Sequence, residues 1–296
     1  MSVAQFTWPE GARLAMSFVV NVEELSELSV KEGDKGPEPV DELQVSLKIP
    51  IRNYVNESNY RYGIEAGAPR ILALLEKHRI TATFTAAALS LERAPEMTRQ
   101  IVAQGHEICC HGWRWIHQFS FTEEKERDFI RKGVETIERV TGTRPYGWLS
   151  RYLHTPNTRR LLVEEGFRYH MDDLSRDYPF WQTIEGADRP LVVTPYALDT
   201  NDMKFWLDPS MTPKAWLDYA IGTFDWLHEE GRSAPRMMSL GLHLRIIGRP
   251  GRIGALDHFM TYVRQKRGVW IAPRLAIADH FAAEVAYDPA TAEAFS

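Results

Sequence analysis

Short apolar runs of strand type alternate with helical segments along most of this 296-residue chain. The first run, Leu14–Val22, is almost continuously apolar, as expected for a strand that is covered on both faces. Sustained alternation of this kind is typical of a parallel sheet or an α/β barrel. We expect strands at 14–22, 81–87, 107–110, 146–149, 191–194, 237–243 and 269–272, and helices at 66–78, 96–104, 122–141, 157–165, 213–230 and 253–265.

The whole chain, 1–296, is predicted to form a single domain. Its length also permits two domains, but no internal repeat, low-complexity tract or linker divides it. Single α/β barrels commonly reach this size. The polar stretch between Glu24 and Gly63 shows no periodicity, so we expect an extended loop at about 25–63.

Composition and charge exclude several classes of partner. The net charge is −5 and no Lys/Arg run exceeds two residues, so nucleic acid is not an expected partner. No run reaches the ~18 apolar residues of a membrane helix, and Met1–Arg13 lacks the features of a signal peptide, so we expect a cytoplasmic protein. Cys109 and Cys110 are adjacent and are not expected to form a disulfide.

Polar side chains stand at the carboxyl ends of several predicted strands, where ligand sites form in α/β folds. For any one of them, a structural salt bridge or hydrogen bond is the alternative role. Their coincidence favours one functional cluster. These residues are Asn21, Glu23, Glu24, His111, Arg151, Asp172 and His243.

The same segments resemble the NodB-homology polysaccharide deacetylases, in which an apolar strand ends in paired acids and a late strand ends in a histidine. A Gly-His-Glu…His-Gly pattern lies between them, at 105–112. Within that superfamily the chain is most similar to the branch that holds allantoinases and cyclic imide hydrolases. The matching motifs are Glu57–Gly63, His111–Trp115, Pro156–Arg159, Leu198–Met203 and Gly241–Gly251.

This resemblance implies a distorted (β/α)7-type barrel of the NodB-homology fold, cleavage of a carbon–nitrogen bond, and a homo-oligomer, either a dimer or a tetramer. Sugar deacetylases carry an Asp-Asp pair after the first strand, with one acid as the base and one as a metal ligand. This chain has Glu23 and Glu24 instead. Related deacetylases also place a second histidine four residues after the first, where this chain has Trp115.

A metal site is predicted from Glu23, His111 and His117, which lies six residues after His111. One carboxylate and two imidazoles suit zinc, or another divalent ion, with a water position left open. Related allantoinases have an acid at the position of His117 and are thought to work without metal. A site without metal is therefore the alternative.

Hydrolysis of an amide or imide needs an activated water, a stabilised oxyanion and a proton for the leaving nitrogen. We expect Glu23 or Glu24 to act as the base, and a bound ion or His111 to polarise the carbonyl. His243 is expected to protonate the leaving nitrogen, and Arg151 to orient the substrate. The expected substrate contacts are Trp113, Trp115, Trp148, Trp181, Glu57, Tyr60 and Asp172.

The preferred substrate is a small cyclic imide, because a pocket rimmed by aromatic side chains suits a small planar ring. The tripeptide Ser150-Arg-Tyr152 also resembles the imidase version of the motif. Three alternatives remain open. They are hydrolysis of allantoin or a hydantoin-type ureide, N-deacetylation of an acylated sugar, and a barrel that binds without catalysis.

Overall fold

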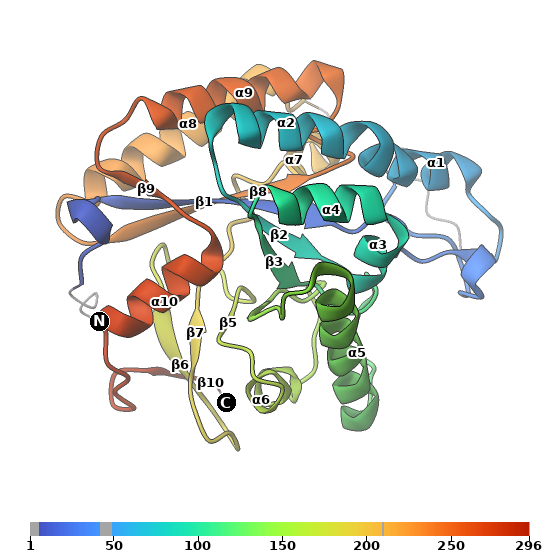
Figure 1. The fold of residues 1–296 in the computed structure, drawn as a ribbon, viewed down its shortest axis with the longest axis horizontal. Coiled ribbons are helices and arrows are strands. Elements are labelled where there is room, and N and C mark those ends of the chain that lie inside the picture. The colour runs from blue at the N-terminus through green and yellow to red at the C-terminus, as the bar shows by residue number, and fades with distance from the viewer. Residues whose placement is uncertain (1–5, 42–48, 209, 296) are drawn as a thin grey trace.

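The computed structural model describes residues 6–41, 49–208 and 210–295, and within them one ten-stranded sheet forms the centre (Figure 1). The strands lie in the order β10-β6-β7-β5-β4-β3-β2-β1-β8, with β9 paired to β1 beside this path. Adjacent strands run parallel except β6 and β7. The bounds are β1 (Leu14–Val22), β2 (Thr83–Ala86), β3 (Glu107–Cys110), β4 (Gly147–Trp148), β5 (Tyr169–His170), β6 (Phe180–Ile184), β7 (Leu191–Val193), β8 (Arg236–His243), β9 (Val269–Ile271) and β10 (Glu293–Phe295).

Strand β1 is apolar throughout because both of its faces are buried. Phe18 and Val20 belong to the large outer core that includes the surrounding helices, whereas Ala15 and Val19 belong to a separate inner cluster. Successive side chains of a strand point to opposite faces, which explains this division. Strand β8 runs beside β1 in a register that sets Asn21 opposite His243, so the two strands end at the same level.

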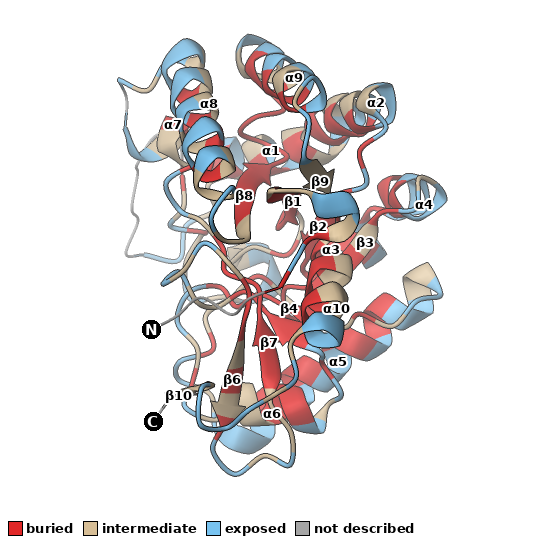
Figure 2. Ribbon diagram, turned by 90° about the vertical axis from the view of Figure 1, so that its left-hand side faces the viewer, coloured by how far each residue is buried: buried red, intermediate tan, exposed pale blue. Residues whose placement is uncertain are grey.

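Helices cover the outer face of the sheet, and α8, α9, α2, α4, α5 and α6 pack against one another in that order (Figure 1). In Figure 2 these helices are buried on the side toward the sheet and exposed on the other. The helix bounds are α1 (Tyr54–Tyr62), α2 (Ala68–His78), α3 (Ala88–Arg93), α4 (Pro95–Ala103), α5 (Glu123–Thr141), α6 (Thr158–Glu164), α7 (Lys204–Leu207), α8 (Pro213–Glu230), α9 (Pro250–Arg264) and α10 (Arg274–Glu284).

Among the described residues the sheet does not close, because its end strands are β10 and β8, and the segment 194–203 leads from β7 to β8. The backbone N–H of Asp202 donates to the carbonyl of Gly241 at 2.9 Å. The Thr200 hydroxyl donates to the carbonyl of Ser239 at 2.7 Å. Helix α10 adds Ile277 and other apolar side chains to the inner cluster. The result is an incomplete α/β barrel.

The predicted alternation of strands and helices is confirmed, and the bounds of the predicted elements agree with the structure to within three residues. The strand at 107–110 and the helix at 213–230 have the predicted limits. Helices α3 and α10 and strands β6 and β10 were not predicted. The predicted extended loop at 25–63 is wrong in its last part, because residues 54–62 form helix α1 with Asn53 as its N-cap. Residues 42–48 of that loop lie outside the described residues.

The structure also bears on the predictions for the two cysteines and for membrane-spanning helices. Cys109 and Cys110 are both free and buried, and burial raises the pKa of both thiols, which disfavours the reactive thiolate form at either position. In the parts of the chain that the structure describes, no helix is both long enough and apolar enough to cross a membrane.

Gly67 allows the helix that precedes α2 to pack directly against the turn after β8. A Cβ atom at this position would overlap the carbonyl oxygen of Leu244. We expect Gly67→Ala to lower the free energy of unfolding by about 3 kcal/mol, because backbone atoms must move apart. Gly254→Ala is the matched control, since Gly254 lies in α9 with no atom near the added methyl group, and it should be neutral or stabilise by about 0.5–1 kcal/mol. Urea unfolding measures both, and equal values would contradict the packing argument.

Candidate active site

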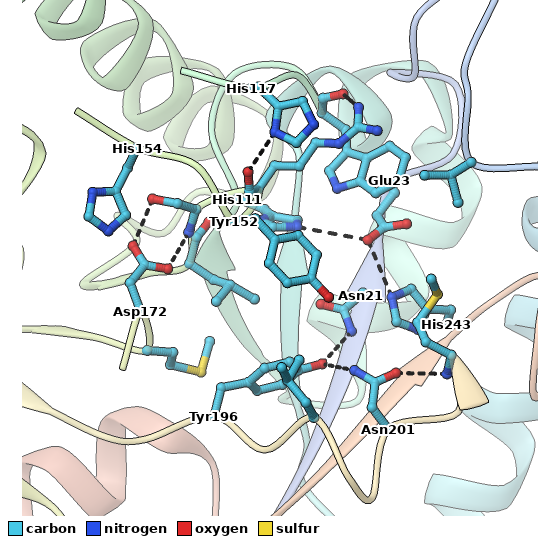
Figure 3. Close-up of a pocket in the computed structure, with 18 of the residues that line it drawn as sticks. Asn21, Glu23, His111, His117, Tyr152, His154, Asp172, Tyr196, Asn201 and His243 are labelled. Carbon is cyan, nitrogen blue, oxygen red and sulfur yellow. Dashed lines mark hydrogen bonds and ion pairs between the residues drawn. The ribbon is translucent and has the colours of Figure 1, made fainter. Parts of the chain in front are cut away.

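Three ionisable side chains meet at the carboxyl edge of the sheet (Figure 3). Glu23 directly follows β1, His111 directly follows β3, and His243 is the last residue of β8. The Nε2 atom of His243 lies 3.3 Å from Glu23 Oε1, and the Nε2 atom of His111 lies 3.9 Å from the same oxygen. All three residues are at most 5% exposed. The structure therefore brings together three of the residues predicted to act in catalysis.

Both imidazoles are oriented by hydrogen bonds at Nδ1. His243 Nδ1 donates to Asp202 Oδ1 at 2.6 Å, while Asp202 Oδ2 accepts the backbone N–H groups of His243 and Ile247. His111 Nδ1 donates to the backbone carbonyl of Leu149, also at 2.6 Å. Each ring consequently directs its Nε2 atom toward Glu23. A carboxylate bonded to Nδ1, as Asp202 is to His243, commonly fixes the orientation and tautomer of a catalytic histidine.

The charges of this cluster oppose the effect of burial. Burial alone would raise the pKa of Glu23, but His243 and Arg245 together hold that pKa well below its usual value. Burial also disfavours a charged His243, yet the carboxylates of Glu23 and Asp202 raise its pKa to about 10. At neutral pH the site therefore contains a carboxylate base beside an imidazolium acid.

Arg245 supplies the positive charge next to Glu23. Its Nη1 atom donates to Glu23 Oε2 at 2.8 Å and lies 3.4 Å from Glu24 Oε1. The guanidinium carbon lies 4.2 Å from the centre of the Tyr60 ring. Glu24 is fully buried behind this group, where it also accepts the backbone N–H of Glu23. Of the two glutamates, Glu23 is the one that lines the cavity described next.

A cavity of about 340 Å³ opens in front of these residues. Its lining comes from the ends of β1, β3 and β8 and from the loops that follow β4, β5 and β7. On its floor the Tyr196 hydroxyl accepts hydrogen bonds from the amides of Asn21 and Asn201, both at 2.9 Å. The catalytic cluster therefore lies at one side of a partly open cavity that is large enough for a small molecule.

Arg151 also lines the cavity, but its guanidinium is engaged within the protein. The two terminal nitrogens donate to Glu38, at 2.5 and 3.0 Å, and one also donates to the carbonyl of Trp115. The guanidinium stacks on the Trp115 ring, 3.6 Å from its centre. This geometry does not support the predicted role of Arg151 in orienting the substrate, and it favours a role in holding Glu38 and Trp115 in place.

The chain matches the family model of polysaccharide deacetylases over residues 59–170. A curated relative from Schizosaccharomyces pombe, named for the same family, is 34% identical over 300 residues, which cover 95% of this chain and 93% of that relative. This chain belongs to the polysaccharide deacetylase family.

Two solved structures show the same fold at 40% identity. The probable polysaccharide deacetylase of Pseudomonas aeruginosa PAO1 has a TM-score of 0.90, with 95% of each chain covered. The Puue allantoinase has a TM-score of 0.91, with 95% of this chain and 94% of that chain covered. The barrel of the polysaccharide deacetylase family is thus confirmed. As a member of this family, the chain is a hydrolase that acts on carbon–nitrogen bonds other than peptide bonds.

The metal set predicted by analogy with polysaccharide deacetylases does not assemble. His117 lines the cavity, where its Nδ1 donates to the backbone carbonyl of Arg151 at 3.0 Å. Across the described residues, no three His, Cys, Asp or Glu side chains are placed to hold a metal ion. The second carboxylate oxygen of Glu23 is already bonded to the positive Arg245. A guanidinium beside this carboxylate opposes a second positive charge there, so the residues do not fit zinc.

Three of the four predicted tryptophan contacts lie outside the cavity. Trp148 is fully buried in the outer core and donates from its indole N–H to Ser150. The Trp113 ring packs on that core with the Lys132 amine 3.4 Å from its centre. The Trp181 indole donates to Val285 near α10. Only Trp115 lines the cavity, because the other three side chains point to different faces of the strands or loops that carry them.

The remaining predicted substrate contacts are divided. Asp172 lines the cavity, but its two oxygens accept from the N–H and the hydroxyl of Ser150, both at 2.7 Å. Glu57 lies outside the cavity and pairs with Arg52. Tyr60 is fully buried and does not line the cavity. Asp172 keeps its place as a candidate contact, whereas Glu57 and Tyr60 do not line this cavity.

Asp202, Arg245 and Tyr196 were not predicted as site residues. Asp202 and Arg245 do lie inside two of the motifs that carry the family resemblance, Leu198–Met203 and Gly241–Gly251. Their charge, together with their position inside these motifs, could have identified both as site residues. Tyr196 follows β7 by three residues and had no comparable signal.

Proposed function

We propose that this protein opens the ring of a small cyclic imide by hydrolysing a carbon–nitrogen bond. The observation that carries the proposal is the pair of Glu23 and His243, 3.3 Å apart at one side of a cavity that opens to solvent. A carboxylate base and an imidazolium acid at this spacing can act on the water and on the leaving nitrogen of one bound ring. The size and largely apolar lining of this cavity also suit a small molecule better than a polar glycan chain.

In the proposed reaction, Glu23 takes a proton from a water molecule, which attacks one carbonyl carbon of the imide. His111 Nδ1–H donates to the carbonyl of Leu149, so Nε2 of the neutral ring is an acceptor that can orient the attacking water, and the imidazolium of His243 stabilises the negative charge on the tetrahedral oxygen. His243 then protonates the ring nitrogen as the carbon–nitrogen bond breaks. Arg245 keeps Glu23 ionised, and Asp202 keeps His243 protonated and aligned. No step requires a metal.

The main alternative substrate is a ureide ring such as that of allantoin. The 40% identity to the Puue allantoinase over 94% of its chain supports this candidate. Both reactions attack a carbonyl carbon beside a ring nitrogen, so the same base and acid serve either one. Substrate identity therefore depends on what surrounds the catalytic cluster.

The purified protein tested on succinimide, dihydrouracil, hydantoin, allantoin and N-acetylglucosamine should open an imide ring and release no acetate. Turnover should persist after treatment with a chelator, with elemental analysis confirming metal removal. Acetate release without ring opening would replace the imide proposal with N-deacetylation, and no turnover at all would favour a binding barrel. Loss of activity on chelation that zinc restores would overturn the mechanism without metal and leave ring opening in place.

A further inference from the structure

Most of the cavity surface away from Glu23 is apolar. Leu149 follows β4, Met171 and Leu174 follow β5, and Leu198 and Met203 follow β7, and all five line the cavity. Hydrogen bonds between backbones set these loops side by side: Met171 N–H donates to Trp148, and Tyr196 N–H donates to Asp173. The aliphatic wall is therefore continuous with the catalytic cluster, and a ligand of the cluster lies against it.

The polar side chains on this side of the cavity are already bonded inside the protein. Asp172 is bonded to Ser150. Asn201 donates to Tyr196 and accepts the backbone N–H of Met203. His117 and His154 each bond a backbone carbonyl through Nδ1. A polar group that entered here would lose hydrogen bonds to water and find as replacements mainly the Nε2 atoms of His117 and His154 and the Tyr152 hydroxyl.

The outer part of the wall exposes apolar surface to solvent. Leu174 is 52% exposed, Leu198 is 39% exposed, and Tyr152 is 66% exposed. Tyr152 also has a backbone φ of +52°, a left-handed conformation that is unfavourable for a bulky residue. Tyr152 lines the same cavity as the five aliphatic residues, and Figure 3 shows its ring among the side chains around that cavity. The strained backbone thus places an aromatic ring in the same cavity as the aliphatic wall.

We propose that the substrate ring carries an apolar substituent, preferably an aromatic one, that lies between Tyr152 and the aliphatic wall formed by Leu149, Met171, Leu174, Leu198 and Met203. This inference rests on the proposed ring-opening function. A single unsubstituted imide ring would leave much of the cavity of about 340 Å³ unfilled. An apolar substituent gains by leaving water, whereas a ureido substituent does not.

The test compares kcat/KM for succinimide with that for 2-phenylsuccinimide. A parallel comparison covers hydantoin, 5-phenylhydantoin and allantoin. We expect the phenyl compound to exceed the unsubstituted ring by at least about tenfold in each series, since small changes of apolar contact in a pocket already produce such factors. Allantoin should be the poorest hydantoin substrate.

Leu174→Asn and Leu198→Asn should each lower the ratio of phenyl to unsubstituted kcat/KM by about fivefold to tenfold. Leu153→Asn is the matched control, because Leu153 is an exposed leucine that does not line the cavity, and the ratio should stay unchanged. A ratio of one or less in the native protein would overturn the inference while ring opening stands. The inference would also be overturned if Leu174→Asn or Leu198→Asn dissociated an oligomer and left the ratio of kcat/KM values unchanged. These leucines would then form an interface between copies of the chain. Failure of every imide and hydantoin would instead reject the proposed function.

Discussion

Glu23→Gln should lower kcat for ring opening by about 10³-fold or more, because the amide removes the proposed base and keeps the length of the side chain. The glutamine oxygen can still accept a hydrogen bond from Arg245, so the fold around the site should be retained. The substitution also removes the negative charge that helps to keep His243 protonated. Steady-state kinetics on the imide substrate, followed by the loss of imide absorbance, measures the effect.

Two matched variants make this result specific. Glu57→Gln breaks only a partly exposed ion pair with Arg52 outside the cavity, and activity should remain within about twofold of the native value. Glu24→Gln should cost less than Glu23→Gln, because Glu24 lies behind Arg245 and does not line the cavity. If Glu24→Gln were the more damaging change in a folded protein, the assignment of the base would pass to Glu24. Full activity in Glu23→Gln would remove Glu23 from the mechanism.

The alternation of elements could be predicted from sequence because each long element shows one clear pattern. Strand β1 is a continuous apolar run, and helix α5 begins at the N-cap Thr122 and ends at Gly142 in a left-handed conformation. Helix α10 was missed because its apolar side chains are not gathered on one helical face. Strand β10 is short and gains its place from β6, a partner distant in sequence, whereas β6 pairs with the neighbouring strand β7 and was missed because its residues show no continuous apolar run. Local patterns do not report such pairings.

The position of a polar residue at a strand end was a better guide to the site than the aromatic content of its motifs. Glu23, His111 and His243 met as predicted because parallel strands in register must end at the same edge. Trp148 lies at such an end as well, but it points to the outer face and packs against Phe167. A shift of one residue along a strand moves a side chain to the opposite face of the sheet. The sequence pattern did not predict the register of β4, which has only two residues.

The sequence did not predict that Arg245, instead of a metal ion, would supply the positive charge beside Glu23. The position of Arg245 depends on a turn that the sequence pattern does not specify. Arg245 stands only two residues after His243, yet the chain turns sharply there, with the N–H groups of Ile246 and Ile247 bonded to the carbonyl of His243. This turn brings the guanidinium back to Glu23. The position of a residue beyond a strand end depends on the turn that follows the strand. Here Asp202 stabilises the turn by accepting the N–H of Ile247. Asp202 therefore organises both the acid and the charge beside the base.

Asp202→Asn should lower kcat by about 10²-fold and narrow the pH range of activity. In the native protein the pKa of His243 is raised to about 10, so its protonated form persists through neutral pH and kcat/KM should fall only as the pH approaches about 10. Removal of one of the two carboxylates that raise this pKa shifts it down. The alkaline limb of the pH profile should then move to lower pH, while Glu23 remains ionised through its contact with Arg245.

The pH profile separates this positioning role from a loss of stability. The substituted amide would retain one acceptor oxygen where the carboxylate of Asp202 has two, so some destabilisation, about 1–3 kcal/mol, should accompany the change. That effect alone would lower activity equally at every pH at which the variant is folded. Asp199→Asn, three residues earlier and exposed with a bond to Tyr219, is the matched control and should leave both kcat and the alkaline limb in place. An Asp202→Asn profile with an unmoved alkaline limb would show that Asp202 does not set the protonation of His243, and the acid would have to be sought elsewhere in the cavity.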